Sequence, residues 1–330
     1  MAMTCEQIRH EANERMDRRR QQAETLAARR REEIETKLPQ VAELRRMLSL
    51  TAAELAGNIL SKGTPEEKDA AFEKIRKNSM DSRAMIEKTL TDAGYPPDYD
   101  KVKYRCDKCG DTGFTLYGMC GCMKRLINQV ASEQLNAQAN MPDADFEHFD
   151  LDMYRGITVN NADAYKHMKK VYEDCIAYAD SFTGEGESLL FIGRPGLGKT
   201  HLSLAIAHRV TDRGYSAVYG SLLDRLRQTE DEHFGRAEGD TLSLLLDVDL
   251  LVLDDLGTEP HTPFCESTLY NIINTRINTR KPVIISTNLS TAELTGTYNE
   301  RIISRLFYSY NSVMFLGDDV RKIMRRRSIT

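Results

Sequence analysis

Apolar runs alternate with polar helical stretches through the second half of the chain. The apolar runs predict buried strands near residues 189–192, 215–219, 250–256, 282–288 and 312–316. The polar stretches predict helices near residues 124–139, 162–182, 201–212, 222–234, 264–279, 298–307 and 318–327. Strands that alternate with helices form a parallel sheet covered on both faces, so we expect an α/β domain of three layers.

The first hundred residues follow a different pattern and predict helices alone. Residues 4–38 contain almost no glycine or proline, and further helices are expected over 41–60 and from Pro65 to about residue 93. Two interpretations of this segment stay open, a solvated helical hairpin and an arginine-rich docking arm for a partner protein. We expect three parts: a helical arm (1–98), a zinc module with a linker helix (99–140) and a nucleotide-binding domain (141–330).

Composition and charge restrict the class of protein. The chain has 330 residues, 41% of them hydrophobic and 29% charged, with a net charge of −5, which fits a folded chain of about two domains. No apolar run is long enough to cross a bilayer, and the N-terminus has no apolar signal region. We therefore expect a cytoplasmic protein, where reduced cysteines that cluster in sequence suggest a metal site rather than disulfides.

The stretch that follows the first predicted strand reads G-x-x-x-x-G-K-T and ends where a helix is expected to begin. This order of strand, glycine loop and helix predicts a phosphate-binding P-loop that binds ATP. Lys199 is expected to reach the β- and γ-phosphates, and the Thr200 hydroxyl to help hold Mg²⁺. The loop residues expected to bind the nucleotide are Gly193, Arg194, Pro195, Gly196, Leu197, Gly198, Lys199 and Thr200.

Two later strands end in polar side chains. The run 250–253 is followed by Asp254 and Asp255, and a carboxylate at the carboxyl end of a neighbouring parallel strand lies where the Mg²⁺ of a P-loop must be. We expect Asp254 to join the Mg²⁺ shell through water and Asp255 to orient or deprotonate the attacking water. Asn288 ends the next strand, and its amide can hydrogen-bond that water or the γ-phosphate.

Four cysteines form two short knuckles before the nucleotide-binding domain. Cys106 and Cys109 are followed by Cys120 and Cys122, and four thiolates are what Zn²⁺ takes in a closed structural site. A redox Cys-x-x-Cys motif is the alternative. A module this small buries little core, so the metal would supply much of its folding energy.

The sequences GRPGLGKTH, LLVLDDLG, IISTN and ERIISRL resemble those of AAA+ ATPases of the DnaC/DnaI type, the bacterial replicative helicase loaders. IstB-type insertion-sequence ATPases are similar. The resemblance implies an AAA+ fold from about residue 146 to 327, and it adds His201 to the loop residues. It also implies that Asp254 and Asp255 form the Walker B motif, the acidic end of the second strand of the site. Many relatives carry Glu at the second position, and the shorter side chain of Asp255 favours slow, switch-like hydrolysis.

Further roles are implied by the resemblance alone. Asn288 matches sensor 1, and Arg305 matches an arginine finger that completes a neighbouring subunit's site, with Arg301 as a possible support. Arg321 falls where a sensor-2 arginine would lie, and Phe149 with Asp150 matches a segment near the adenine. Arg225 and Arg227 fall in a region that contacts single-stranded DNA in related initiators.

The resulting hypothesis is an ATP-dependent loader of a hexameric replicative helicase. It would bind single-stranded DNA, associate with itself through the arginine finger and use ATP, Mg²⁺ and Zn²⁺. The alternatives are an IstB-like transposition helper and a zinc-containing nucleic-acid adaptor whose ATPase is vestigial. A metabolic P-loop kinase is disfavoured, since no feature supplies an acceptor site.

Overall fold

The computed structural model describes residues 5–60, 65–138 and 144–322. These residues divide into two compact units, one of residues 14–120 and one of residues 121–322 with the first turns of α1. Each unit is described by itself. The expected boundary between a helical arm and a zinc module, near residue 98, stays a prediction.

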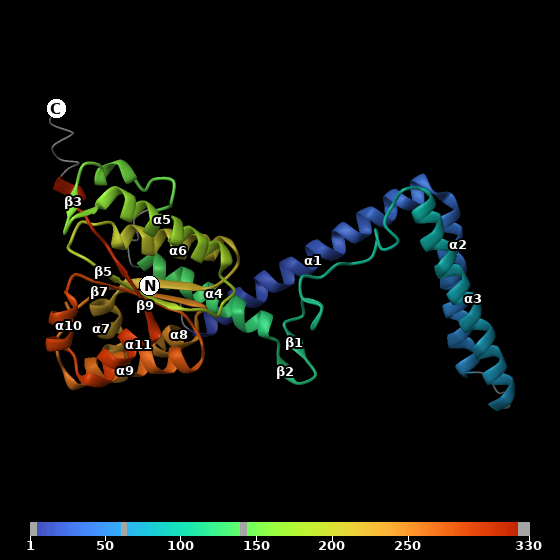
Figure 1. The fold of residues 1–330 in the computed structure, drawn as a ribbon. Coiled ribbons are helices and arrows are strands. Elements are labelled where there is room, and N and C mark those ends of the chain that lie inside the picture. The colour runs from blue at the N-terminus through green and yellow to red at the C-terminus, as the bar shows by residue number, and fades with distance from the viewer. Residues whose placement is uncertain (1–4, 61–64, 139–143, 323–330) are drawn as a thin grey trace. The chain divides into compact units, whose positions relative to one another are not determined.

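The smaller unit contains three helices and a short hairpin among its described residues (Figure 1). The helices are α1 (Cys5–Lys37), α2 (Pro39–Leu60) and α3 (Pro65–Asp92), close to the ranges expected from sequence. Pro39 begins α2, where the missing N–H of proline costs no helical hydrogen bond. A small apolar cluster joins the helices through the buried side chains of Ile34, Val41, Ile86 and Leu90.

The hairpin pairs β1 (Phe114–Thr115) with β2 (Gly118–Met119) in antiparallel register. Leu116 and Tyr117 form the turn between the two strands, and both are 99% exposed.

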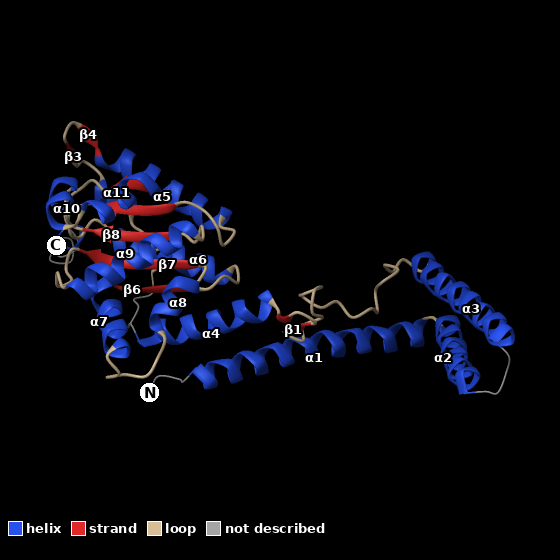
Figure 2. Ribbon diagram, turned by 90° about the horizontal axis from the view of Figure 1, so that it is seen from below, coloured by secondary structure: helices blue, strands red, loops and turns tan. Residues whose placement is uncertain are grey.

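The larger unit is built on one sheet whose five strands, within the described residues, are all parallel and run in the order β6-β7-β8-β5-β9. The strands are β5 (Ser188–Ile192), β6 (Ala217–Ser221), β7 (Leu250–Leu256), β8 (Val283–Thr287) and β9 (Tyr310–Met314). The expected α/β fold with a parallel sheet is confirmed, with helices on both faces of the sheet (Figures 1 and 2).

Alternate residues of the strands supply the two cores of this unit. Leu189 and Phe191 of β5 face the core formed with α5 (Ala164–Ser181) and α6 (Lys199–Asp212). Leu190 and Ile192 face the opposite core, formed with α7 (Leu222–His233), α8 (Thr241–Asp247), α9 (Pro263–Asn278), α10 (Thr291–Thr297) and α11 (Glu300–Ser309). The three-layer arrangement follows from this period of two within each strand.

Several expected elements differ in their bounds. The helix expected at 162–182 begins at 164, because residues 158–159 and 162–163 pair as β3 (Thr158–Val159) and β4 (Ala162–Asp163). Three short elements have no counterpart among those predicted from the sequence: α8, α10 and the 3-10 helix η1 (Leu151–Tyr154). The strand expected at 312–316 begins two residues earlier as β9, and half of the helix expected at 318–327 lies outside the described residues. The linker helix is α4 (Gly121–Gln138).

Candidate functional site

A cleft of about 330 Å³ lies at the carboxyl ends of the strands. It is lined by the loop between β5 and α6 with the start of α6, by side chains at the ends of β7 and β8, and by the segment after β9: Ala144, Pro195, Gly196, Leu197, Gly198, Lys199, Thr200, His201, Leu204, Asp255, Asn288, Val320 and Arg321. Most of the residues that the sequence assigned to nucleotide binding therefore share one cleft. This is where parallel α/β sheets bind ligands.

Glycine is required at two positions of the loop. Gly196 and Gly198 have φ angles of 80° and 81°, in the left-handed region. A Cβ on Gly198 would lie 2.7 Å from the Phe149 ring, so only glycine lets the loop approach that ring. Gly198 is also the residue from which α6 begins, so the helix N-terminus points its N–H groups toward the cleft.

Lys199 is buried, and its ammonium group is fully engaged within the loop. It donates hydrogen bonds to the Gly193 carbonyl at 2.7 Å, the Arg194 carbonyl at 3.0 Å and Asn288 Oδ1 at 2.8 Å. Burial lowers the pKa of Lys199, while the nearby Asp255 and Asp254 carboxylates oppose that shift. A desolvated cation held in this way attracts phosphate oxygens strongly.

Asp254 connects the loop to the sheet. Its Oδ2 accepts hydrogen bonds from Thr200 Oγ1 at 2.8 Å and from the Tyr219 hydroxyl at 2.9 Å, and its Oδ1 accepts one from Ser286 Oγ. The sequence predicts that β5 and the acidic strand β7 are neighbours, but β8 lies between them. The Thr200–Asp254 contact nevertheless brings together the two side chains assigned to Mg²⁺.

Asp255 adopts an unusual backbone conformation. Its φ angle is 58°, and the pairing of β7 with β8 is irregular between Leu253 and Leu256. The distortion turns the Asp255 carboxylate into the cleft, where Asn288 Nδ2 donates to it at 2.9 Å. Burial and the neighbouring Asp254 carboxylate raise the pKa of Asp255 above its ordinary value. Strain and a raised pKa are both typical of residues that act in chemistry.

An aromatic cluster lies against the loop at Gly198. Phe149 stacks on Tyr154 and Tyr172 and meets the His201 ring edge-on at 5.3 Å between centroids. The buried Tyr154 hydroxyl donates to the Leu197 carbonyl at 2.9 Å. Phe149 therefore lies against the loop, while Asp150 caps the short helix η1.

Arg305 is separate from this cleft. It lies on α11, with its guanidinium 4.6 Å from the centre of the Tyr270 ring and its Nε donating to Asn274 Oδ1 at 2.9 Å. It is not among the residues that line the cleft, whereas Arg321 is. Arg305 is therefore not part of the cleft of its own chain, and its finger role stays a prediction.

Arg225 has a structural position instead of the DNA contact suggested by resemblance. Only 5% of it is exposed, and its guanidinium donates to the Tyr219 carbonyl at 2.6 Å. Burial lowers the pKa of Arg225 to about 10. The expectation for Arg225 is therefore wrong, because its charge is buried within the fold, whereas Arg227 is exposed.

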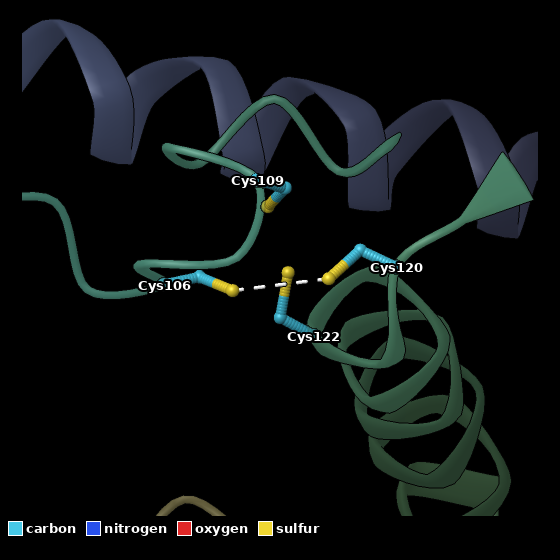
Figure 3. A group of neighbouring side chains, drawn as sticks. All are labelled: Cys106, Cys109, Cys120 and Cys122. Carbon is cyan, nitrogen blue, oxygen red and sulfur yellow. Dashed lines mark hydrogen bonds between the residues drawn. The ribbon is translucent and has the colours of Figure 1, made fainter. Parts of the chain in front are cut away.

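The four cysteines converge as the sequence predicted (Figure 3). Their sulfur atoms all lie within 4.8 Å of one another, and Cys106 Sγ and Cys120 Sγ are 3.8 Å apart. A tetrahedral zinc with Zn–S bonds of about 2.3 Å would separate its sulfurs by about 3.8 Å. The group therefore fits a metal ion held by four thiolates.

Asp111 organises the first knuckle, a role that the sequence analysis missed. Its buried carboxylate accepts hydrogen bonds from the backbone N–H groups of Arg105, at 2.8 Å, and Cys106, at 3.0 Å, and it pairs with Arg19 of α1. Hydrogen bonds to the charged form, chiefly from Arg19, outweigh burial and lower the pKa of Asp111.

Tyr219 and Ser286, which hold Asp254, were also missed by the sequence analysis. The pairing of Ser221 with Asp254 puts Tyr219 and Asp254 on one face of the sheet, and that parity is the signal that could have identified the tyrosine.

Similarity to a known family lies in the part of the chain that contains the cleft. A family model described as IstB-like ATP binding protein matches residues 123–328. The replicative helicase loader DnaC of Escherichia coli K12 is 30% identical over 131 residues, which cover 39% of this chain and 54% of that protein. An insertion-sequence ATP-binding protein of Mycobacterium tuberculosis is 28% identical over 141 residues, covering 41% of this chain and 56% of that protein.

The chain thus spans about half the length of the curated relatives it matches. Among solved structures, the DnaC helicase loader is similar with 24% identity and a TM-score of 0.44, covering 52% of this chain and 98% of that one.

Within the described residues, no helix combines the length and apolar character that a membrane crossing demands.

Proposed function

Since the chain belongs to the family of IstB-like ATP-binding proteins, we propose that it is an ATP-dependent loader of a ring-shaped replicative helicase onto single-stranded DNA. The observation that carries the ATP-dependent part is the shared cleft of Lys199, Thr200, Asp255 and Asn288. The relationship to the helicase loader DnaC supports the loader role.

In this proposal, the loop between β5 and α6 binds the triphosphate of ATP. The backbone N–H groups and Lys199 hold the phosphates, and Thr200 with Asp254 would hold Mg²⁺, whose chemistry is to neutralise charge on the transferred phosphoryl group. Asn288 orients the attacking water, and Asp255 accepts its proton. The Asp255 carboxylate is one methylene shorter than glutamate, which favours slow hydrolysis that acts as a switch.

The Asp255 role predicts opposite effects for two substitutions. Asp255→Asn should lower ATP hydrolysis by about 100-fold or more, because the general base is lost. Asp255→Glu should raise the rate, because the longer side chain brings its carboxylate closer to the water. Steady-state phosphate release measures both, and ATP binding by Asp255→Asn serves as the control for folding. Equal rates for wild type and Asp255→Asn would contradict the assignment.

The raised pKa of Asp255 also predicts a pH dependence. A general base acts only when it is deprotonated, so hydrolysis should fall as the pH drops through a value above the ordinary aspartate pKa. The acid limb should be absent from the residual activity of Asp255→Asn. A wild-type limb at or below the ordinary aspartate value would contradict the assignment.

The proposal assigns the cysteine group to structural zinc. Purified protein should contain one zinc ion per chain, and Cys106→Ser should lose it, since three thiolates bind zinc far more weakly than four. Metal analysis by mass spectrometry measures this, and increased proteolysis between residues 99 and 120 should accompany the loss. Cys265→Ala, which changes a buried cysteine outside the group, should retain the zinc.

A second function, that of a transposition helper, is favoured by the insertion-sequence relative. It would use the same cleft, so partner capture must distinguish the two functions. The full-length chain should co-purify with a hexameric replicative helicase, and ATP should change the amount recovered. Recovery of a transposase in place of the helicase would exclude the loader function and leave the ATP-binding assignment intact.

A further inference from the structure

The hairpin beside the four cysteines carries an exposed apolar tip. Leu116 and Tyr117 are 99% exposed, Phe114 is 52% exposed and Met119 is 49% exposed. Residues 112–119 contain no charged side chain. Apolar side chains this exposed at a turn stabilise nothing within the described chain, and a cluster of them marks a contact site for a ligand.

The tip is held rigidly by its surroundings. The N–H of Cys120, one of the four clustered cysteines, donates to the Gly113 carbonyl at 2.9 Å and closes the base of the hairpin. Asp111 fixes the preceding turn through its bonds to the backbone and its ion pair with Arg19. The backbone that carries the two aromatic rings is therefore fixed at its base, which lowers the backbone entropy lost on binding.

The segments around the hairpin are basic, although the whole chain is acidic. Residues 14–31 and 101–119 contain eleven basic and five acidic residues, a net charge of +6 in a chain whose total is −5. The two segments contact each other, since Arg19 pairs with Asp111 and the Tyr104 hydroxyl donates to Glu24 Oε1 at 3.1 Å. Arg105 and Lys108 of the first knuckle are exposed. Basic charge of this density attracts a polyanion.

We propose that this hairpin and its basic surroundings bind single-stranded nucleic acid, with Tyr117 and Phe114 stacking on bases. Exposed rings next to basic side chains are the combination with which proteins bind unpaired strands without reading their sequence. A duplex hides its base faces, so the tip selects single strands. The site is distinct from the ATP cleft, and the inference does not depend on the proposed loader function.

The test measures binding of a fluorescent dT20 oligonucleotide by the full-length zinc-bound protein without nucleotide. Tyr117→Ala should weaken binding by about tenfold, because base stacking is lost, whereas Tyr117→Phe should bind like wild type. Tyr117→Leu, which keeps apolar area but removes the ring, should resemble Tyr117→Ala. Lys108→Gln should reduce the salt dependence of binding, with a slope smaller by about one.

Tyr308→Ala is the matched control, since Tyr308 is 90% exposed and lies in the other unit. It should leave dT20 binding unchanged, and zinc content should be equal in all variants. Unchanged dT20 binding by Tyr117→Ala would overturn the inference. So would a Tyr117→Leu variant that binds like wild type, or a Tyr117→Ala variant that loses only capture of a partner protein. Omitting ATP keeps these results separate from any failure of the ATPase assignment.

Discussion

Replacing Arg305 with alanine should lower ATP hydrolysis by about 1,000-fold, while each subunit still binds ATP. The guanidinium of Arg305 lies against Tyr270 and Asn274 and outside the cleft of its own chain. Arg305 must then act on phosphate bound to a neighbouring subunit, where its guanidinium stabilises the negative charge that develops during phosphoryl transfer. Phosphate release measures the rate, and equilibrium binding of labelled ATP measures retention of the site.

Mixing variants distinguishes action in trans from a structural defect. Arg305→Ala supplies an intact loop and Lys199→Ala supplies an intact arginine, so a mixture should regain part of the activity that each lacks alone. Arg209→Ala is the matched control, because Arg209 also lies over an aromatic ring, Phe146, and pairs with Asp180. Full activity of Arg305→Ala would exclude the finger role, and a mixture that stays inactive would exclude action between subunits.

The Lys199→Ala variant should lose ATP affinity by about 100-fold or more, since charge-assisted contacts to two phosphates disappear. Hydrolysis should fall to background for the same reason. Removal of the Lys199 side chain leaves three acceptors, the Gly193 and Arg194 carbonyls and Asn288 Oδ1, without their shared donor. Some loss of thermal stability is therefore also expected. Isothermal titration with ATP measures the affinity directly.

Lys281 offers a control for the stability effect. It precedes β8 at the opposite end of the sheet, bonds to Asp247, and its pKa is likewise lowered by burial. Lys281→Ala should lose stability and keep its ATP affinity. An unchanged affinity in Lys199→Ala would show that the loop does not bind the triphosphate.

The glycine loop between β5 and α6 could be predicted from the sequence, although the order of the strands could not. The apolar run before Gly193, the glycines and the helix that begins at Lys199 all depend on local conformation, which residue type controls directly. The same holds for the cysteine group, since two short knuckles can bring four thiols together with few intervening residues.

Features that depend on packing between distant segments were missed. The hydrogen bonds that Tyr219 and Ser286 donate to Asp254 form only when β6, β7 and β8 pair with one another, and no local sequence pattern predicts that pairing. Arg225 is an arginine on a polar helix by sequence, yet the space above Gly220 lets its guanidinium turn inward: a Cβ on that glycine would lie 2.2 Å from Arg225 Nε. The short elements α8 and α10 contain too few residues for periodicity to identify.

The central claim is that the loop at Lys199 binds the triphosphate and that Mg²⁺ links it to Asp254. Equilibrium titration of labelled ATP with and without Mg²⁺, in wild type and Asp254→Asn, tests it most directly. Mg²⁺ should tighten binding to wild type, and Asp254→Asn should lose that gain while it keeps the Mg²⁺-independent affinity. No ATP binding by wild type at millimolar concentration, or an undiminished Mg²⁺ effect in Asp254→Asn, would contradict the claim.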